Sequence, residues 1–458
     1  MADLKDSLVP LRDYFDSGVT LSYDFRKTQL DLLEKAILRY EKPLNEALFS
    51  DLKKSPVEVW FSETGLLLAE IRAARKNLRR WMRPKKVSSP LVAFGSTSKI
   101  YPSPLGVVLI IAPWNYPLQL LLNPLVGAIA AGNVAVLKPS ELAPATEAVI
   151  SRMIAEIFPE NYVKLVSGIG SEVVPQMIRE FRFDHIFFTG GTATGKAIYQ
   201  LAASQLTPVT LELGGKSPCI IYEDADLQMA ARRVVSTKFL NAGQSCIAPD
   251  YVLVKGSIKE DFLKVLKDTI AQFYSGNPAE NDDYGKIIDK RHFQRLTGLL
   301  EKGSVYCGGQ VDESSLFIAP TVLSDVSLDD PVMQQEIFGP LLAVRSFSTS
   351  EEAMKIVSAR SHPLALYLFT QNKETQRQWI ERISFGGGCI NDTGIHFMNQ
   401  NLPFGGVGAS GIGAYHGKRS FQVFSHEKSV LKSTTLLDPR LRYPPWKGKL
   451  KWFKRLVR

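Results

Sequence analysis

The feature that most limits the possible folds is an alternation of short apolar runs with helical segments, which begins at Leu105. The apolar runs predict strands at 106–111, 134–137, 162–166 and 185–188. Helical spacing predicts helices at 118–130, 144–158 and 195–206. Such alternation is typical of an α/β protein with a mostly parallel, doubly wound sheet and right-handed crossovers. Ligands bind such sheets at the carboxyl ends of the strands, so functional motifs are expected there.

The length of the chain and its cysteines restrict the number of domains and the cellular location that we expect. A chain of 458 residues exceeds one ordinary core, so two domains are expected. No apolar run approaches the roughly 20 residues of a membrane span, and the acidic start of the chain lacks the apolar stretch of a secretory signal. Four scattered cysteines have neither disulfide-like nor metal-ligand spacing, so we expect a reducing, cytoplasmic location and no metal: Cys219, Cys246, Cys307 and Cys389.

The N-terminal part and the charge balance carry less chemistry. Residues up to about 83 have the pattern of helices, with Ser55 as an N-cap before Pro56, and we expect them to contribute packing. The net charge of +9 is concentrated in 72–86 and 447–458. Nothing resembles a nucleic-acid-binding motif, so we expect no nucleic-acid partner.

Two segments between Leu211 and Cys246 concentrate the candidate chemistry. One reads Glu-Leu-Gly-Gly-Lys-Ser-Pro from Glu212, and the other reads Gly-Gln-Ser-Cys and ends at Cys246. A thiolate attacks a carbonyl carbon, and the resulting thioester is removed by water that a base activates. Cys246 suits the role of the nucleophile, and Glu212 suits the role of the base. A single cysteine is, however, more often a small buried residue of the core.

The two segments resemble the signature segments of the aldehyde dehydrogenase superfamily. The wider sequences at 206–212 and 244–251 are similar to its class 3 branch, the fatty and aromatic aldehyde dehydrogenases. The resemblance covers nearly the whole chain and implies a Rossmann-type cofactor domain, an α/β catalytic domain and a small β oligomerisation element. The expected ranges are 1–85 with 103–209 for the NAD(P)-binding domain, 210–424 for the catalytic domain, 86–102 with 425–435 for the oligomerisation element, and 436–458 for a basic amphipathic tail.

The turn between the fourth strand and its helix is a candidate phosphate site. Gly190, Gly191 and Gly195 allow backbone N–H groups and a helix N-terminus to approach a phosphate, although an ordinary tight turn has the same pattern. The resemblance implies contact with the cofactor's pyrophosphate. Gly191 stands where the family often has a serine, so only backbone donors remain.

Lys138 and Glu141 follow the second strand. The resemblance implies that both bind the adenosine ribose, whereas by themselves they more often form a solvated ion pair in a loop. A carboxylate at Glu141 repels a 2′-phosphate and favours NAD over NADP. Class 3 members often accept both cofactors, so NADP is not excluded.

The remaining candidate site residues lie in turns next to strands or near the C-terminus. Asn115, in a proline-flanked turn, offers an amide to a developing oxyanion, or else it caps the next helix. The resemblance places Trp114 and Phe338 at the cofactor and Glu336 on the nicotinamide ribose. His416 either lines the substrate entrance or is structural.

These residues predict an oxidoreductase that converts aldehydes to acids with NAD(P)⁺ through a thiohemiacetal and a thioester on Cys246. Tyr116, Phe397 and Phe404 suggest medium- or long-chain aliphatic or aromatic substrates. A CoA-acylating dehydrogenase or an acyl-phosphate reductase is an alternative, against which Glu212 counts. A non-catalytic cofactor-binding protein is expected to lose Cys246 or Glu212, and a plain thiol hydrolase remains open.

Two segments predict partners. Residues 87–100 have the pattern of a hairpin, and the resemblance implies a homodimer built on it and on a strand near the C-terminus. In the tail, apolar residues fall on one helical face beside basic ones: Trp446, Leu450, Phe453 and Val457, beside Lys447, Lys451, Lys454 and Arg458. This pattern suits peripheral contact with anionic lipid, or a helix that covers the substrate entrance or the dimer.

Overall fold

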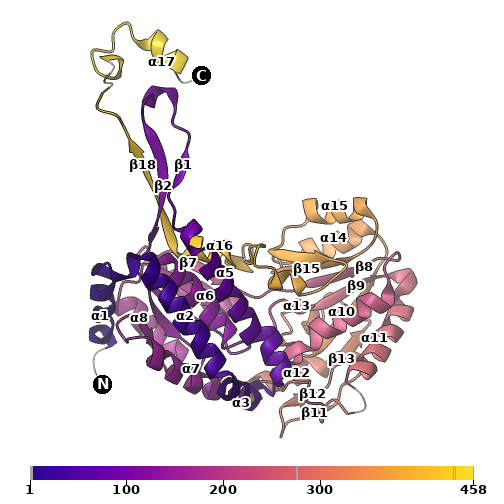
Figure 1. Ribbon diagram of the computed structural model, residues 1–458. Coiled ribbons are helices and arrows are strands. Elements are labelled where there is room, and N and C mark those ends of the chain that lie inside the picture. Colours follow the sequence, from indigo (N-terminus) through magenta and orange to yellow (C-terminus); the bar gives the residue numbers. More distant parts are fainter. Residues whose placement is uncertain (1–3, 275–276, 437, 439, 457–458) are drawn as a thin grey trace.

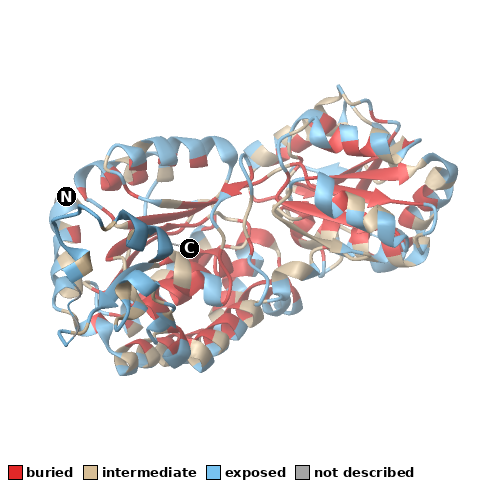
Figure 2. Ribbon diagram, turned by 90° about the horizontal axis from the view of Figure 1, so that it is seen from above, coloured by how far each residue is buried: buried red, intermediate tan, exposed pale blue. Residues whose placement is uncertain are grey.

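The computed structural model contains two large sheets, each covered by helices on both faces, and each sheet with its helices forms one body (Figure 1). The structure describes residues 4–274, 277–436, 438 and 440–456. Buried residues gather along the strands of both bodies and on the inner faces of their helices (Figure 2). The α/β fold predicted from the alternation is therefore confirmed.

The first sheet has six strands in the order β17-β7-β6-β3-β4-β5, all parallel except β17. Their bounds are β3 (Val107–Ile111), β4 (Val134–Lys138), β5 (Val163–Leu165), β6 (His185–Thr189), β7 (Val209–Glu212) and β17 (Gly411–Ile412). The crossover helices are α6 (Gln119–Ala131), α7 (Pro144–Ile157), α8 (Gly170–Glu180) and α9 (Thr192–Ala203). Every residue of β3, β4 and β6 is buried, as expected of strands covered on both faces.

The N-terminal helices belong to the same body. They are α1 (Leu4–Asp16), α2 (Tyr23–Arg39), α3 (Glu41–Leu52), α4 (Pro56–Val59) and α5 (Gly65–Trp81), with a π-helical turn at Trp60–Thr64 between the last two. Ser55 caps α4 by accepting a hydrogen bond from the Glu58 N–H. Helices α2 and α5 bury leucine-rich faces in the core that they share with β3 and β4.

The second sheet has seven strands in the order β10-β13-β14-β9-β8-β15-β16, of which only β10 is antiparallel to its neighbour. The bounds are β8 (Pro218–Ile221), β9 (Tyr251–Lys255), β10 (Ser304–Cys307), β13 (Thr321–Ser324), β14 (Leu341–Phe347), β15 (Ala365–Phe369) and β16 (Gly387–Ile390). Its helices are α10 (Leu227–Phe239), α11 (Lys259–Phe273), α12 (Lys290–Leu300), α13 (Pro331–Gln334), α14 (Ser350–Ser358) and α15 (Lys373–Arg382). A short hairpin, β11 (Val311–Asp312) with β12 (Phe317–Ile318), lies beside it.

The chain crosses between the sheets after Glu212 and later returns. Residue Thr210, near which the boundary is expected, lies inside β7 of the first sheet. Strand β17 pairs with β7, and α16 (Lys418–Val423) packs on α6. Phe404 and Phe421 join the first core. The range 210–424, expected to form the catalytic domain, is thus divided between the two bodies.

A third sheet forms an arm. Strands β1 (Lys85–Val87), β2 (Thr97–Pro104) and β18 (Ser425–Lys432) are antiparallel and project away from both bodies (Figure 1). Apart from Ser425, the residues of β18 are exposed.

The tail continues beyond the end of this arm. Helix α17 (Leu450–Leu456) lies there, away from the two bodies (Figure 1). Trp446 and Leu450 are exposed, whereas Val457 and Arg458 lie outside the described residues. In the described ranges, no helix combines the length and apolarity needed to cross a bilayer.

Candidate active site

The loop that carries Cys246 follows a sharp end of helix α10. Asn241 and Ala242 adopt left-handed backbone conformations, with φ of 52° and 51°. The buried Gln244 side chain then holds the loop, because its Nε2 donates to the carbonyls of Asn241 (3.0 Å) and Lys286 (2.9 Å). Its Oε1 accepts from the Ile288 N–H at 3.0 Å. The Gln of the Gly-Gln-x-Cys segment therefore shapes the loop.

Glu212 ends strand β7 at the carboxyl edge of the first sheet. Its side chain is 2% exposed, and neither carboxylate oxygen has a hydrogen-bond partner among the described residues. Burial raises the pKa of Glu212 well above its usual value. The raised pKa makes the carboxylate form of Glu212 a stronger base than an exposed glutamate.

Two cavities meet between the bodies, and both are lined by Cys246 and Glu212. One, of about 300 Å³, is lined mainly by apolar side chains, among them Tyr116, Phe397 and Phe404. The other, of about 280 Å³, is lined by residues that follow strands β3 and β6 (Trp114, Asn115, Gly190 and Gly191) and by two that precede β14 (Glu336 and Phe338). The structure thus brings the predicted thiol and carboxyl to one place, together with most of the other predicted site residues.

The cysteine thiol is surrounded by groups that oppose its ionisation. Burial, Glu336 and Glu212, in that order, raise the pKa of Cys246 to about 12. The backbone N–H groups of Cys246 and Ile247 act in the opposite direction. Burial also raises the pKa of Glu336 to about 8, and Asp250 adds to this effect. Burial therefore disfavours the charged form of all three groups, Cys246, Glu212 and Glu336.

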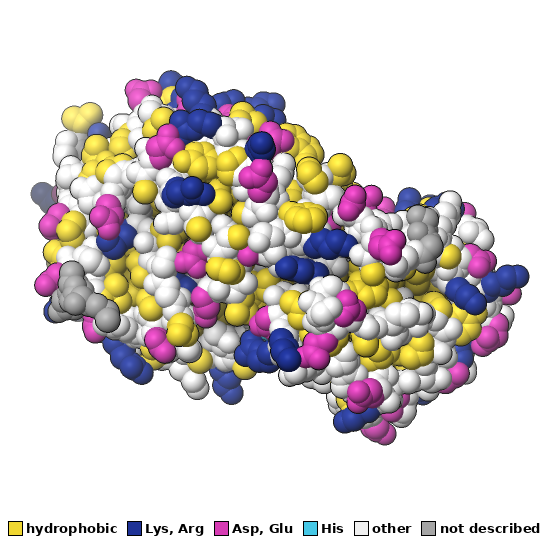
Figure 3. Space-filling view, turned by 90° about the horizontal axis from the view of Figure 1, so that it is seen from below, with side chains coloured by type: hydrophobic (Ala, Val, Ile, Leu, Met, Phe, Trp, Pro, Cys, Tyr) yellow, Lys and Arg dark blue, Asp and Glu magenta, His cyan; other side chains and the backbone are white. Residues whose placement is uncertain are grey.

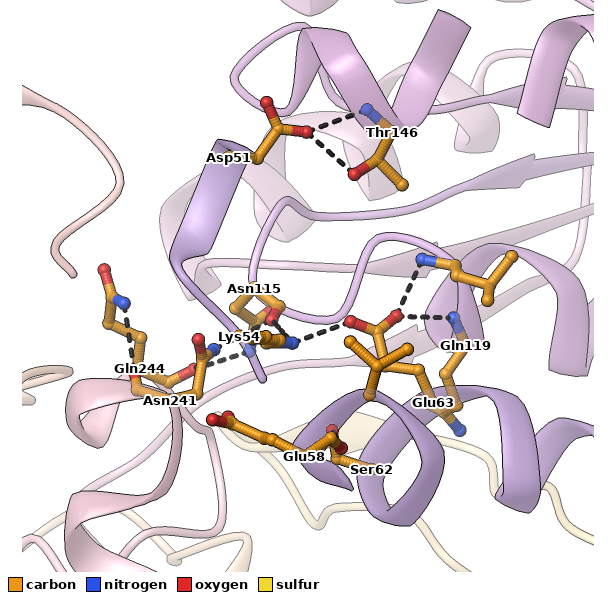
Figure 4. Close-up of polar contacts among 12 residues, drawn as sticks. Asp51, Lys54, Glu58, Ser62, Glu63, Asn115, Gln119, Thr146, Asn241 and Gln244 are labelled. Atoms are coloured by element: carbon orange, nitrogen blue, oxygen red, sulfur yellow. Dashed lines mark hydrogen bonds and ion pairs between the residues drawn. The ribbon is translucent and has the colours of Figure 1, made fainter. Parts of the chain in front are cut away.

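Asn115 lies against the cysteine loop. Its side chain is 2% exposed, and its Nδ2 donates to the Gln244 carbonyl at 3.0 Å. Its own backbone carbonyl accepts two bonds, one from Asn241 Nδ2 and one from Lys54 Nζ, each at 2.8 Å. Figure 4 shows these contacts and the buried side chains behind them.

The glycine turn leads into the first, exposed turn of α9. No described atom lies within 4 Å of the position where Gly191 would carry a Cβ, so the approach to this helix N-terminus is open. Gly195 serves packing instead, because a Cβ there would lie 2.5 Å from Leu213 Cδ2. Across the same cavity the rings of Trp114 and Phe338 meet edge to face, with centroids 5.4 Å apart.

Lys138 and Glu141 lie outside the two cavities, at the end of β4. Lys138 is buried and donates to the Pro139 carbonyl, with Glu141 Oε2 at 3.5 Å. Glu141 is partly exposed and accepts a bond from the Gly170 N–H at the start of α8 (3.0 Å). Burial opposes ionisation, but this bond and Lys138 lower the pKa of Glu141, which keeps it charged at neutral pH.

Several residues lie differently from what motifs alone suggest. His416 is buried against the rings of Phe397 and Phe404 and does not line the apolar cavity. Burial lowers its pKa to about 3, so it is neutral. Conversely, the apolar cavity also includes Arg232 and Asp392, which no motif indicated. They come from a helix face and a loop, which only the folded chain brings together.

Two mostly parallel α/β sheets with a cysteine and a buried glutamate in the cleft between them form the kind of site at which such folds bind nucleotide cofactors. The model of the aldehyde dehydrogenase family matches residues 13–430. The chain belongs to that family, and it is an NAD(P)-dependent aldehyde dehydrogenase that oxidises aldehydes.

Individual relatives cover nearly the whole chain. The 4,4′-diaponeurosporen-aldehyde dehydrogenase of Staphylococcus aureus is 46% identical, over 96% of both chains. Rat aldehyde dehydrogenase family 3 member B1 is 45% identical over 97% of this chain and 95% of its own. The rat dimeric NADP-preferring aldehyde dehydrogenase is 42% identical over 98% and 99%. Among solved structures, the substrate-bound state of Staphylococcus aureus AldH superposes with a TM-score of 0.98 at 45% identity, over 100% of both chains.

Proposed function

We propose that Cys246, Glu212 and Asn115 carry out the oxidation. The Cys246 sulfur bonds to the aldehyde carbon, and the oxyanion of the thiohemiacetal is held by the Asn115 amide and the Cys246 N–H. After oxidation, water activated by Glu212 hydrolyses the thioester to the acid. The observation that carries this proposal is that Cys246 and Glu212 line both cavities.

Activation of the thiol must include loss of its proton, because its surroundings raise its pKa. Glu212 borders the same two cavities and makes no hydrogen bond among the described residues, so its carboxylate is available for the water of the later hydrolysis. Of the two carboxylates that raise the pKa of Cys246, Glu336 has the larger effect. When Glu336 moves away from the thiol to bind a ribose, this effect is removed and the thiolate is favoured.

The residues of the second cavity fit a dinucleotide. Open space at Gly191, in front of the α9 N-terminus, suits a pyrophosphate, and the carboxyl of Glu336 suits a ribose. Trp114 and Phe338 offer aromatic surfaces to a flat ring. The nicotinamide, when bound, supplies the acceptor for the hydride that leaves the thiohemiacetal carbon.

The preferred cofactor is NAD. Lys138 and Glu141 would hold the adenosine ribose, and a charged Glu141 repels a 2′-phosphate. NADP is accepted less well, although the rat dimeric aldehyde dehydrogenase is NADP-preferring.

The substrates are medium- or long-chain aliphatic or aromatic aldehydes, because apolar and aromatic side chains dominate the cavity on the far side of Cys246. Glu212 beside that cysteine supports hydrolysis over transfer to CoA. Free acid rather than acyl-CoA is therefore the expected product when CoA is added.

The assembly is a homodimer that pairs through the arm, since the exposed edge strand β18 offers unpaired backbone groups to a second copy. The tail beyond the arm makes peripheral contact with anionic lipid. Exposed Trp446 and Trp452 and five cations between Lys447 and Arg455 support this role. On the face seen in Figure 3, by contrast, acidic and basic side chains alternate with apolar ones.

Replacement of the nucleophile tests the central proposal. Cys246→Ala removes the thiol without adding bulk, so it should abolish aldehyde-dependent NADH formation while dinucleotide binding, followed by fluorescence quenching, persists. Cys219→Ala in the buried strand β8 is the matched control and should retain turnover. Substantial turnover by the Cys246→Ala enzyme would refute the assignment.

A further inference from the structure

A buried ion pair lies directly behind Asn115. Lys54 Nζ and Glu63 Oε1 are 2.7 Å apart, and both side chains are 0% exposed. Lys54 follows α3, and Glu63 belongs to the π-helical turn before α5, so the pair comes from the N-terminal helices. Removing two charges from water costs several kcal/mol per ion, and apolar side chains of similar volume often stabilise a core as well. Stability alone therefore explains this pair poorly.

The contacts of the pair converge on one turn, 115–118. Lys54 Nζ also donates to the Asn115 carbonyl at 2.8 Å and lies 4.0 Å from the centroid of the Tyr116 ring. The second carboxylate oxygen of Glu63 accepts the N–H groups of Leu118 (2.9 Å) and Gln119 (3.1 Å), at the start of α6. The lysine thus holds one end of the turn and the glutamate holds the other (Figure 4).

The same turn is also held from the second body. Asn241 Nδ2 donates to the Asn115 carbonyl, so this one oxygen accepts bonds from both bodies. The Asn115 amide in turn donates to the Gln244 carbonyl, two residues before Cys246. A shift of the Asn115 backbone therefore moves its amide relative to the thiol. Oxyanion stabilisation is sensitive to such shifts, because donors must lie about 3 Å from the developing charge.

We infer that Lys54 and Glu63 are positioning residues of the oxidation. They hold the 115–118 turn so that the Asn115 amide donates a hydrogen bond to the oxyanion of the adduct on Cys246. This inference rests on the proposed role of Asn115. Neither residue touches the substrate, since neither lines the two cavities. Their effect is expected on the rate of reactions that develop an oxyanion and not on the reactivity of the thiol itself.

Two reactions of Cys246 that need no cofactor separate these effects in the full-length enzyme. Acylation by 4-nitrophenyl acetate passes through a tetrahedral oxyanion, whereas alkylation by iodoacetamide displaces iodide from a saturated carbon and forms none. Lys54→Met should slow acylation about 10- to 100-fold. This effect should not exceed the slowing caused by removal of an oxyanion donor itself. Its alkylation rate should equal that of the wild type. Equal loss in both reactions, or loss in neither, overturns the inference.

A second variant guards against misfolding, because Lys54→Met leaves the Glu63 carboxylate buried without its cation. In Lys54→Met/Glu63→Gln both charges are absent, and the Gln oxygen still accepts the two N–H groups of α6. This enzyme should melt near the wild-type temperature and keep the acylation defect. Recovery of acylation in the double variant overturns the inference.

Two controls identify which statement fails. Arg12→Met removes another ion pair whose carboxylate, Asp184, accepts a backbone N–H, but at the opposite end of β3. Its acylation and alkylation should both be unchanged, and a selective acylation defect there would overturn the special role of the Lys54 pair. Asn115→Ala should slow acylation at least as much as Lys54→Met. If Asn115→Ala has no effect, the proposed function fails; if only Lys54→Met has none, this inference alone fails.

Discussion

The buried carboxyl of Glu212 gives the most demanding prediction. Glu212→Gln preserves size and removes the base, so acyl-enzyme should form at the normal rate and then persist. General-base catalysis contributes about 10² to 10⁴ in rate, and kcat should fall by that factor once hydrolysis limits turnover. The amide is neutral, so it avoids the cost of burying a charge at this site.

The pH dependence of deacylation follows from the same burial. Glu212 acts as the carboxylate, and its raised pKa means that this form is scarce at low pH. Deacylation should therefore increase with pH, about tenfold per unit, until the pH exceeds the pKa of Glu212. The acylated Cys246 sulfur no longer ionises and adds nothing to this slope. Glu336, with a pKa of about 8, titrates nearby, so Glu336→Gln is the control that should retain the slope.

Rapid mixing of enzyme, aldehyde and NAD⁺ measures both quantities. The Glu212→Gln enzyme should release one NADH per active site in a burst and then turn over slowly, with no pH dependence from this carboxyl between pH 6 and 9. Quenched samples should contain acyl-enzyme by mass spectrometry. A variant without a burst, or one whose deacylation keeps the wild-type slope, would show that Glu212 is not the hydrolytic base.

Three further changes have defined outcomes. Burial raises the pKa of Glu70 to about 7, so its contribution to stability is present below about pH 4.5 and is lost as the pH rises through 7; Glu70→Gln should be more stable than the wild type by up to about 3 kcal/mol at pH 8, and equally stable at pH 4.5, in urea denaturation. Glu141→Gln removes the charge that opposes a 2′-phosphate and should lower KM for NADP more than for NAD; an unchanged ratio contradicts the cofactor assignment. Truncation at Tyr443 should abolish co-sedimentation with anionic liposomes and leave turnover of a short aldehyde intact, whereas equal partitioning of both forms rules out lipid contact.

Most strands of the first sheet could be predicted because each is a short, mainly apolar run. Four of the six strands of the first sheet agree with the expected ranges within one or two residues, and burial on both faces leaves little freedom for other patterns. The chemistry was also indicated locally, because Glu212 and Cys246 belong to specific segments at strand and helix ends. Proximity in three dimensions then follows from the parallel topology.

Other features depend on long-range packing and left no local signal. Strand β17 has two residues and pairs with β7 about 200 positions earlier, so the return of the chain to the first body is invisible in its periodicity. The N-terminal helices were expected to contribute packing only. Lys54 appears there as an ordinary charged residue at a helix end, and only the fold shows that its amine is buried against the Asn115 carbonyl.

The active site joins two cores, and the hydrogen bonds that join them are distributed unevenly. On the side of Asn115, the C-terminal end of α3 bonds directly to the second body: the Lys286 N–H donates to the Leu52 carbonyl (3.0 Å), and Lys53 Nζ donates to that of Ala279 (2.9 Å). Gln244 bonds to Lys286 in turn. On the side of Gly191, the helix N-terminus faces open space. Groups that must meet the oxyanion within tenths of an ångström are thus held by both bodies, while the dinucleotide side remains accessible, as repeated binding and release of a cofactor requires.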